Sequence, residues 1–182
     1  RPVTWGILST ADINRAVIPP AQASEKCDLI AVASRDSARA EAYAREWGIE
    51  RSYGSYEALL EDADVEAVYI SLPNSMHCEW SIRAVEAGKH VLCEKPLSRR
   101  ASEVEEAFDA AERGGRLLSE AFMWRHNPQT RKLTELVSEG AVGALRVIRS
   151  SFSFTIADDP NNVRLLSGLD GGALMDVGSY CV

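Results

Sequence analysis

Residues 3–14 of this chain read VTWGILSTADIN. The apolar run from Val3 to Leu8 has the length of a buried strand, and the small and polar residues after it suit a tight turn. A second apolar run, CDLIAVAS, follows at residues 27–34. Strands that are apolar throughout are typical of a parallel sheet with both faces covered. The opening of the chain therefore predicts an α/β architecture.

The same alternation of strand and helix continues to about residue 126. Further strands are predicted at 51–53, 65–71, 90–93 and 117–123. Helices are predicted between the cap Asp36 and the stop Gly48, at 56–61, at 77–87, and from Ala101 to Gly114. Because single amphipathic helices separate the strands, right-handed crossovers give a doubly wound parallel sheet. We predict one such domain over residues 1–126.

The pattern changes near residue 127. Asn127-Pro128 is a strong helix start, with the asparagine as cap and the proline in the first turn. From Ile148 onward apolar and polar residues mostly alternate, which is typical of an antiparallel sheet with one covered face. A final helical stretch follows at 172–182. Residues 127–182 are interpreted as the beginning of an incomplete α+β domain with a mostly antiparallel sheet.

Composition excludes several classes of protein. Hydrophobic residues make up 46% and charged residues 26%, which is ordinary for a globular protein and rules out disorder. With a formal net charge of −7, the chain has no excess of positive charge that would attract nucleic acid or an anionic membrane. The uncharged run between Glu66 and Glu79 is shorter than the ~20 residues of a spanning helix. We predict a protein without nucleic-acid or membrane partners.

The four cysteines are scattered, with no CxxC pair and no histidine at ligand spacing. This pattern predicts neither a metal site nor a disulfide framework, and it favours reduced thiols in a cytoplasmic protein. No charged start followed by an apolar stretch marks a secretory signal. Because the sequence begins at Arg1 without methionine and ends at Val182 within a pattern, we expect a trimmed or partial chain.

The turn after the first strand is where a doubly wound sheet holds a dinucleotide pyrophosphate, on a helix N-terminus. Ser9, Ala11 and Asn14 stand at the three glycine positions of G-x-G-x-x-G. All three suit a turn, but a plain strand–turn–helix fits them equally well. The hydroxyls of Ser9 and Thr10 offer hydrogen bonds to phosphate that glycine lacks.

The end of the second strand discriminates between cofactors. An acidic residue there would accept the ribose 2'-hydroxyl of NAD, whereas this chain has Ser34 followed by Arg35. A guanidinium binds a 2'-phosphate with paired hydrogen bonds, and a carboxylate would repel it. The pair therefore favours NADP and leaves NAD open. Taken alone, Arg35 also fits a solvated residue before a helix.

Candidate catalytic residues lie at two further places. Glu94-Lys95-Pro96 follows the fifth strand at the carboxyl edge of the sheet, where open α/β folds bind ligands. Lys95 there can hold a substrate hydroxyl or relay its proton. Asp176 and Tyr180 stand four apart in the last helical stretch, so one helix face would carry both. The ordinary structural explanations are an exposed lysine and a buried, hydrogen-bonded carboxylate.

The order of these signals is more specific than any one of them. The chain contains WGILSTADI, VASRD, YISLPNSMH, GKHVLCEKPL, EAFMWRHNPQ and GGALMDVGSY. In this order they resemble the glucose–fructose oxidoreductase / inositol dehydrogenase / MocA family over essentially the whole chain. Ser34-Arg35, FMWR and Tyr180 make the sequence most similar to the branch of the dimeric dihydrodiol dehydrogenases and NADP-dependent xylose dehydrogenases.

This resemblance implies a two-domain oxidoreductase with an N-terminal Rossmann fold. It implies hydride transfer between NADP, or NAD, and a CH–OH group of a sugar, polyol or trans-dihydrodiol. Tyr180 would take the hydroxyl proton, Lys95 would contact substrate and nicotinamide, and Asp176 would orient the substrate. The implied cofactor-binding residues are Ser9, Thr10, Ala11, Asp12, Ile13, Ser34, Arg35, Leu72, Pro73, Asn74, His77, Glu94 and Lys95. No residue is predicted to bind a metal.

The resemblance also implies a small-molecule substrate and a homo-oligomer, dimer or tetramer, formed through the C-terminal sheet. The chain departs from the family pattern in the missing glycines of the phosphate turn, in Asp170 in place of a glycine, and in Asn127 where many relatives carry histidine. Some relatives keep the fold and lose the chemistry, so a non-catalytic dinucleotide-binding regulator is the alternative. The presence of both Lys95 and Tyr180 favours an enzyme.

Overall fold

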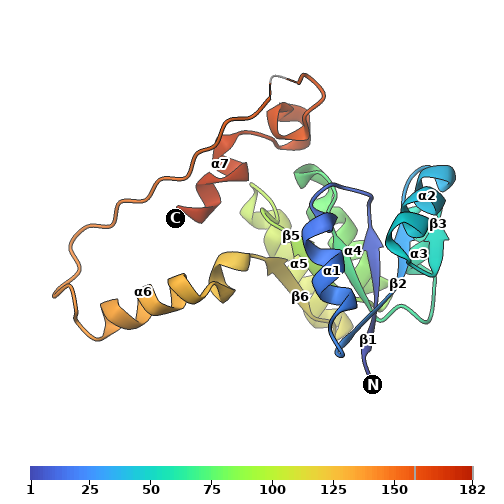
Figure 1. The fold of residues 1–182 in the computed structure, drawn as a ribbon, viewed down its shortest axis with the longest axis horizontal. Helices are drawn as coiled ribbons and strands as arrows, with labels where there is room; N and C mark the ends of the chain where they lie inside the picture. The colour runs from blue at the N-terminus through green and yellow to red at the C-terminus, as the bar shows by residue number, and fades with distance from the viewer. Residues whose placement is uncertain (158, 182) are drawn as a thin grey trace. The chain divides into compact units, whose positions relative to one another are not determined.

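Two compact units, Arg1–Glu120 and Ala121–Val182, make up the chain, and the computed structural model describes residues 1–157 and 159–181. A six-stranded sheet forms the centre of the first unit (Figure 1). Its strands are β1 (Val3–Leu8), β2 (Cys27–Ala33), β3 (Arg51–Tyr53), β4 (Ala67–Ile70), β5 (His90–Glu94) and β6 (Leu118–Ala121). They lie in the order β3-β2-β1-β4-β5-β6, and the pairs among β1 to β5 have parallel registers. The order therefore reverses between β1 and β4.

This sheet confirms the doubly wound architecture, and each strand predicted in the first unit is present. Three strands are shorter than predicted, and β2 lacks only the last residue of its predicted run, Ser34. The predicted strand at 117–123 ends early, because Met123 already begins the 3₁₀ helix η2 (Met123–His126). Likewise β4 covers only the centre of the predicted 65–71.

Helices connect the strands and flank the sheet. They are α1 (Asn14–Gln22), α2 (Ser37–Trp47), α3 (Tyr56–Leu60), the 3₁₀ helix η1 (Asn74–Met76), α4 (His77–Glu86) and α5 (Ala101–Gly114). The Asp36 side chain accepts the Arg39 N–H at 2.9 Å and so caps α2, and Gly48 ends this helix at a left-handed φ of 65°. Apolar side chains such as Leu8 and Val68 are fully buried in the core.

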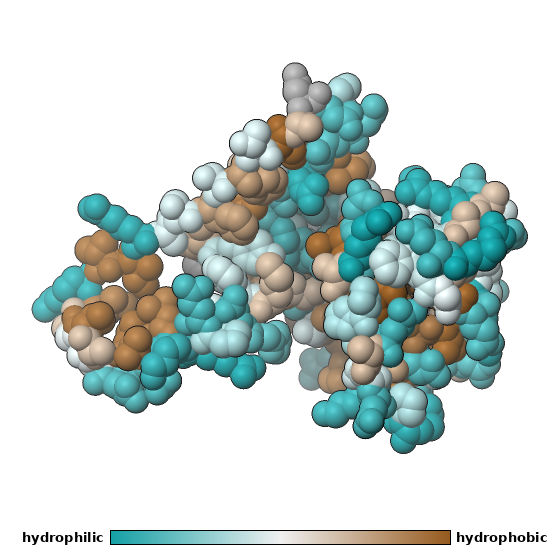
Figure 2. All heavy atoms as spheres, in the orientation of Figure 1, coloured by the Kyte–Doolittle hydropathy of each residue, from teal (hydrophilic) through white to brown (hydrophobic). Residues whose placement is uncertain are grey.

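The second unit contains short helices and an extended segment. Besides η2, its helices are α6 (Pro128–Ser138), η3 (Val163–Leu165), η4 (Ser167–Leu169), α7 (Ala173–Asp176) and η5 (Gly178–Tyr180). Asn127 caps α6 as predicted, since its side chain accepts the Gln129 N–H at 2.9 Å. The alternating stretch that begins at Ile148 pairs with no other strand in the described part of the chain, so the antiparallel sheet stays a prediction. Apolar residues reach the surface of this unit (Figure 2), and Ile148 is 74% exposed.

The last helical stretch differs from the prediction. It is not one helix, because Val177 leaves the helical region with φ −123° and ψ −21°, and η5 starts a new turn. The expectation that Asp176 and Tyr180 share one face of a continuous helix is therefore wrong. Among the residues that the structure describes, no helix is both long and apolar enough to cross a bilayer.

Candidate functional site

The carboxyl ends of the strands bring most predicted site residues to one edge of the sheet. Ser9 follows β1, Ser34 follows β2, Leu72 lies just beyond β4, and Glu94 ends β5. In an open α/β sheet the ligand crevice lies at the carboxyl edge where the strand order reverses, here between β1 and β4. This edge is the candidate site.

A buried hydrogen-bond network joins the two strand ends at that reversal. Ser9 Oγ lies 2.7 Å from Ser71 Oγ, Ser71 Oγ donates to Asn14 Oδ1 at 2.6 Å, and Asn14 Nδ2 donates to Ser9 O at 3.1 Å. Ser9 itself has a φ of 131°, a conformation that favours glycine. Its hydroxyl is engaged in the interior, so the structure lends no support to phosphate binding by this group, which stays a prediction.

The turn after β1 presents unpaired backbone donors. Among the described contacts, the N–H groups of Thr10, Asp12 and Ile13 have no acceptor, whereas the Ala11 N–H donates to Ser9 Oγ at 3.1 Å. The turn leads into α1, whose first turn holds no acidic residue. Amides at the start of a helix are the usual partners of a phosphate group. The backbone, rather than the serine side chain, is therefore what this turn offers to a pyrophosphate.

Two arginines lie at the end of β2. Arg35 follows Ser34, and Arg39 lies in the first turn of α2, where its Nη2 donates to Thr10 O at 3.4 Å. Both guanidinium groups act on the Tyr56 hydroxyl: burial raises the pKa of Tyr56, and the two positive charges oppose that rise. Sequence reasoning missed Arg39, although its spacing of four residues from Arg35 was an available signal. Ser34 is buried beside them.

The loop after β4 contains four predicted residues. Leu72 is buried, Pro73 and Asn74 are partly buried where η1 begins, and His77 is 1% exposed. The His77 ring nitrogens lie 2.7 Å from Leu72 O and 2.7 Å from Pro96 O. Burial lowers the pKa of His77, and the two carbonyl groups only partly oppose it. The enclosed ring links this loop to the turn after β5. His77 therefore stabilises the two loops, and its buried ring presents no atom to a cofactor.

The turn after β5 is held at both ends. Tyr69 OH donates to Glu94 Oε1 at 2.6 Å, and Glu94 Oε2 accepts the Lys95 N–H at 3.3 Å. On the other side, the Leu97 N–H donates to Glu120 Oε1 at 2.8 Å. Lys95 is partly buried at the carboxyl edge of the sheet. Glu94 therefore fixes the backbone from which the Lys95 side chain extends.

The second unit carries the other predicted catalytic residues. The Tyr180 ring is surrounded by Phe122, Trp124 and Phe152, at centroid distances of 5.0, 5.9 and 5.5 Å. Asp176 forms an ion pair with Arg164, whose Nε lies 3.2 Å from Asp176 Oδ2. Aromatic packing thus orients Tyr180, and a guanidinium orients Asp176.

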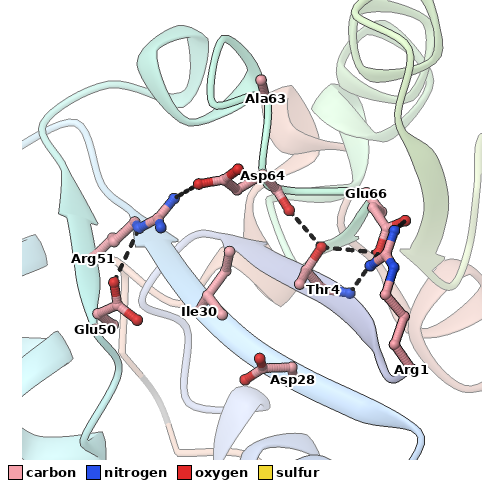
Figure 3. A pocket seen from close by; sticks show the side chains of 9 residues that line it. All are labelled: Arg1, Thr4, Asp28, Ile30, Glu50, Arg51, Ala63, Asp64 and Glu66. Carbon is pink, nitrogen blue, oxygen red and sulfur yellow. Dashed lines mark hydrogen bonds and ion pairs between the residues drawn. The ribbon is translucent and has the colours of Figure 1, made fainter.

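A charged hollow of about 480 Å³ lies at the opposite, amino edge of the sheet (Figure 3). Arg51 there pairs with Asp64 at 2.8 Å, and Arg1 pairs with Glu66 at 2.7 Å. The Arg1 guanidinium lowers the pKa of Glu66 to about 2. Because these arginines already pair with carboxylates, and open α/β sheets bind ligands at the other edge, this hollow is not the candidate site.

In the part of the chain that the structure describes, the side chains form neither a metal-binding cluster nor a disulfide. No group of His, Cys, Asp and Glu side chains there is arranged to hold a metal ion. All four cysteines are free, and burial raises the pKa of Cys78 to about 11. In the first unit the candidate site therefore consists of backbone amides, two arginines and Lys95, while the other predicted catalytic residues, Tyr180 and Asp176, belong to the second unit.

A doubly wound sheet with free amides after β1 and arginines after β2 defines a dinucleotide-binding domain. Comparison with known proteins agrees with this class. The family profile described as "Oxidoreductase family, NAD-binding Rossmann fold" matches residues 3–122, and the "GFO/IDH/MocA C-terminal domain" matches residues 130–182. The chain belongs to the GFO/IDH/MocA oxidoreductase family, which confirms the resemblance noted in its sequence.

Individual relatives match almost the whole chain. D-xylose 1-dehydrogenase (NADP(+)) 2 of Haloferax volcanii is 49% identical over 98% of this chain and 54% of its own length. Trans-1,2-dihydrobenzene-1,2-diol dehydrogenase of Danio rerio is 36% identical over 98% of this chain and 53% of its own. A solved 3-ketoreductase from Actinomadura kijaniata, in complex with NADP and TDP-benzene, has a TM-score of 0.86 at 40% identity, covering 99% of this chain and 55% of that one. The chain spans about half the length of the curated relatives it matches.

Proposed function

We propose that the protein is an NADP-dependent oxidoreductase that transfers a hydride between nicotinamide and a CH–OH group of a sugar, polyol or trans-dihydrodiol. Relatives that are 49% and 36% identical to it are a xylose dehydrogenase that uses NADP(+) and a dihydrodiol dehydrogenase. When bound, the nicotinamide supplies hydride chemistry that no side chain can perform. The protein's part is to bind, to orient and to move a proton.

One observation carries the cofactor assignment. The N–H groups of Thr10, Asp12 and Ile13, which have no acceptor among the residues that the structure describes, follow β1 at the start of α1, and a pyrophosphate offers only acceptor oxygens. Arg35 and Arg39 provide two positive charges at the end of β2, where a 2'-phosphate needs them. These groups fit NADP better than NAD.

Lys95, Tyr180 and Asp176 are the residues proposed for the chemistry. In oxidation the Tyr180 phenol oxygen would accept the substrate hydroxyl proton, and in reduction it would return it. The Lys95 ammonium would stabilise the phenolate form, and Asp176 would orient the substrate. The support is their place in the family motifs, together with the contacts that fix the Lys95 backbone and the Tyr180 ring.

We also propose that the chain contains two domains with different roles. Residues 1–126 bind the cofactor, and residues 127–182 begin the substrate domain. The C-terminal family match at 130–182 supports this division. The exposed apolar side chains of the second unit support a homo-oligomer, dimer or tetramer, formed through the sheet predicted for the C-terminal domain. The free cysteines agree with a cytoplasmic location.

A fluorescence titration of the chain with NADPH and with NADH tests the proposal. We expect NADPH to bind at least about tenfold more tightly, because charged hydrogen bonds to the extra phosphate contribute at least about 1.5 kcal/mol. Equal affinities would remove the 2'-phosphate contact, and no binding of either nucleotide would overturn the proposal. In the whole protein, NADPH binding without turnover of any pentose, hexose, inositol or dihydrodiol would favour the regulator instead.

A further inference from the structure

We propose that Arg164 is a positioning residue that sets the direction of the Asp176 carboxylate, an inference that rests on the function proposed above. Arg164 lies in η3, and Asp176 is the last residue of α7. Arg164 Nε lies 3.2 Å from Asp176 Oδ2, and the Asp176 side chain is 19% exposed. A carboxylate orients a substrate only where its own rotamer is fixed by neighbouring hydrogen bonds, and this guanidinium fixes it.

The backbone of Arg164 is also held against the segment that leads to Asp176. Arg164 O accepts the Gly172 N–H at 2.8 Å, and Gly172 O accepts the Asp176 N–H at 2.9 Å. A Cβ on Gly171 would lie 2.7 Å from Arg164 O and 2.7 Å from Val163 O, so glycine is needed for this approach. Arg164 is therefore joined to Asp176 by two routes, one through the backbone and one through its side chain.

The ion pair is not a large source of stability. The Arg164 side chain is 49% exposed, and exposed ion pairs contribute little to folding. Asn162 Oδ1 holds the same loop by accepting the Arg164 N–H at 3.1 Å, and this bond does not involve the guanidinium. A purely structural role thus predicts almost no effect when the guanidinium is removed, whereas a positioning role predicts a loss of turnover.

The experiment compares Arg164→Met, Arg164→Lys and Asp176→Asn in the whole protein. Arg131→Met, at an exposed arginine of α6, is the matched control. We expect Arg164→Met to lower kcat about 10- to 100-fold, because small misplacements of an orienting group carry costs of that order. The Kd for NADPH and the Tm stay at wild-type values, and Arg164→Lys recovers part of the lost kcat. The double variant R164M/D176N is no slower than D176N, since both changes break one interaction.

A pair of glycine variants tests the backbone route. Gly171→Ala pushes Arg164 away and is expected to reproduce the loss of kcat, whereas Gly168→Ala, where a Cβ meets nothing within 4 Å, leaves kcat unchanged. If the wild-type protein turns over no substrate, the proposed function fails and this inference fails with it. If the wild type is active and Arg164→Met keeps its kcat, or loses no more than Arg131→Met, the inference alone is overturned.

Discussion

Ser9 and Ser71 meet with their hydroxyl oxygens 2.7 Å apart, at the place where the strand order reverses between β1 and β4. Asn14 closes the network from α1 by accepting from Ser71 and donating to Ser9 O. Ser9 holds a φ of 131° within this network. The shape of the turn that offers amides to a pyrophosphate therefore depends on a residue 62 positions away along the chain.

Replacing Ser71 with alanine tests that dependence. The change removes the donor to Asn14 Oδ1, while Ser9 Oγ loses one contact and keeps Ser71 O and the Ala11 N–H. A buried polar group that loses its partner costs about 1–3 kcal/mol. We expect a loss of that size in the free energy of unfolding by urea, together with weaker NADPH binding. Ser119→Ala is the control, because Ser119 is exposed and its hydroxyl makes a long, weak bond of 3.5 Å to Glu120 O. Wild-type stability in Ser71→Ala would contradict the argument.

Arg35→Ala and Arg39→Ala should each weaken the binding of NADPH more than that of NADH, because NADH lacks the 2'-phosphate. A charged hydrogen bond contributes about 1.5–3 kcal/mol, which corresponds to about 10- to 150-fold in Kd. Fluorescence titration with both nucleotides measures the difference. Arg45→Ala is the matched control on α2, since Arg45 is exposed and its contact with Glu41 is 4.0 Å long. Equal losses for the two nucleotides would show that neither arginine contacts the phosphate.

The sequence predicts much of the first unit because its signals are local. The bounds of β1 and β3 agree with the predicted ones, and Asp36 and Gly48 mark the ends of α2. Since parallel strands end at one edge, strand order alone also brings Ser9 and Lys95 to the same edge of the sheet.

What sequence reasoning missed depends on contacts between distant residues. The Ser9 hydroxyl turns inward because Ser71 receives it, and Arg39 reaches the phosphate turn through Thr10 O, 29 positions away. His77 is enclosed because carbonyl groups from two different loops converge on its ring. No periodicity or motif spacing contains such information. The predicted antiparallel sheet is a similar case, since a strand is completed only by its partner.

Acidification should destabilise the protein through His77. Burial lowers the pKa of the folded His77 below its ordinary value of 6.5, so the unfolded ring binds a proton at pH values where the folded ring has none. The free energy of unfolding therefore falls as the pH is lowered through about 6.5, above the range in which Asp62 and Glu103 titrate. Urea unfolding of the wild type and of His77→Gln at several pH values measures this, and the variant should lack that step. Stability that rises on acidification would instead mean that the two carbonyl groups keep the folded ring protonated.

Lys95→Met separates binding from chemistry. Methionine has a similar length and no charge, so the variant keeps the turn that Glu94 holds while it loses the ammonium group. We expect turnover to fall by at least about 10²-fold, the usual contribution of a group that assists proton transfer, with NADPH still bound. Steady-state rates of the whole protein and a fluorescence titration measure the two effects, and Lys132→Met, at an exposed lysine of α6, serves as control. Because the Lys95 backbone is fixed independently of its side chain, a loss of turnover cannot be ascribed to a collapsed turn if NADPH binding persists. Full activity in Lys95→Met would remove this residue from the mechanism.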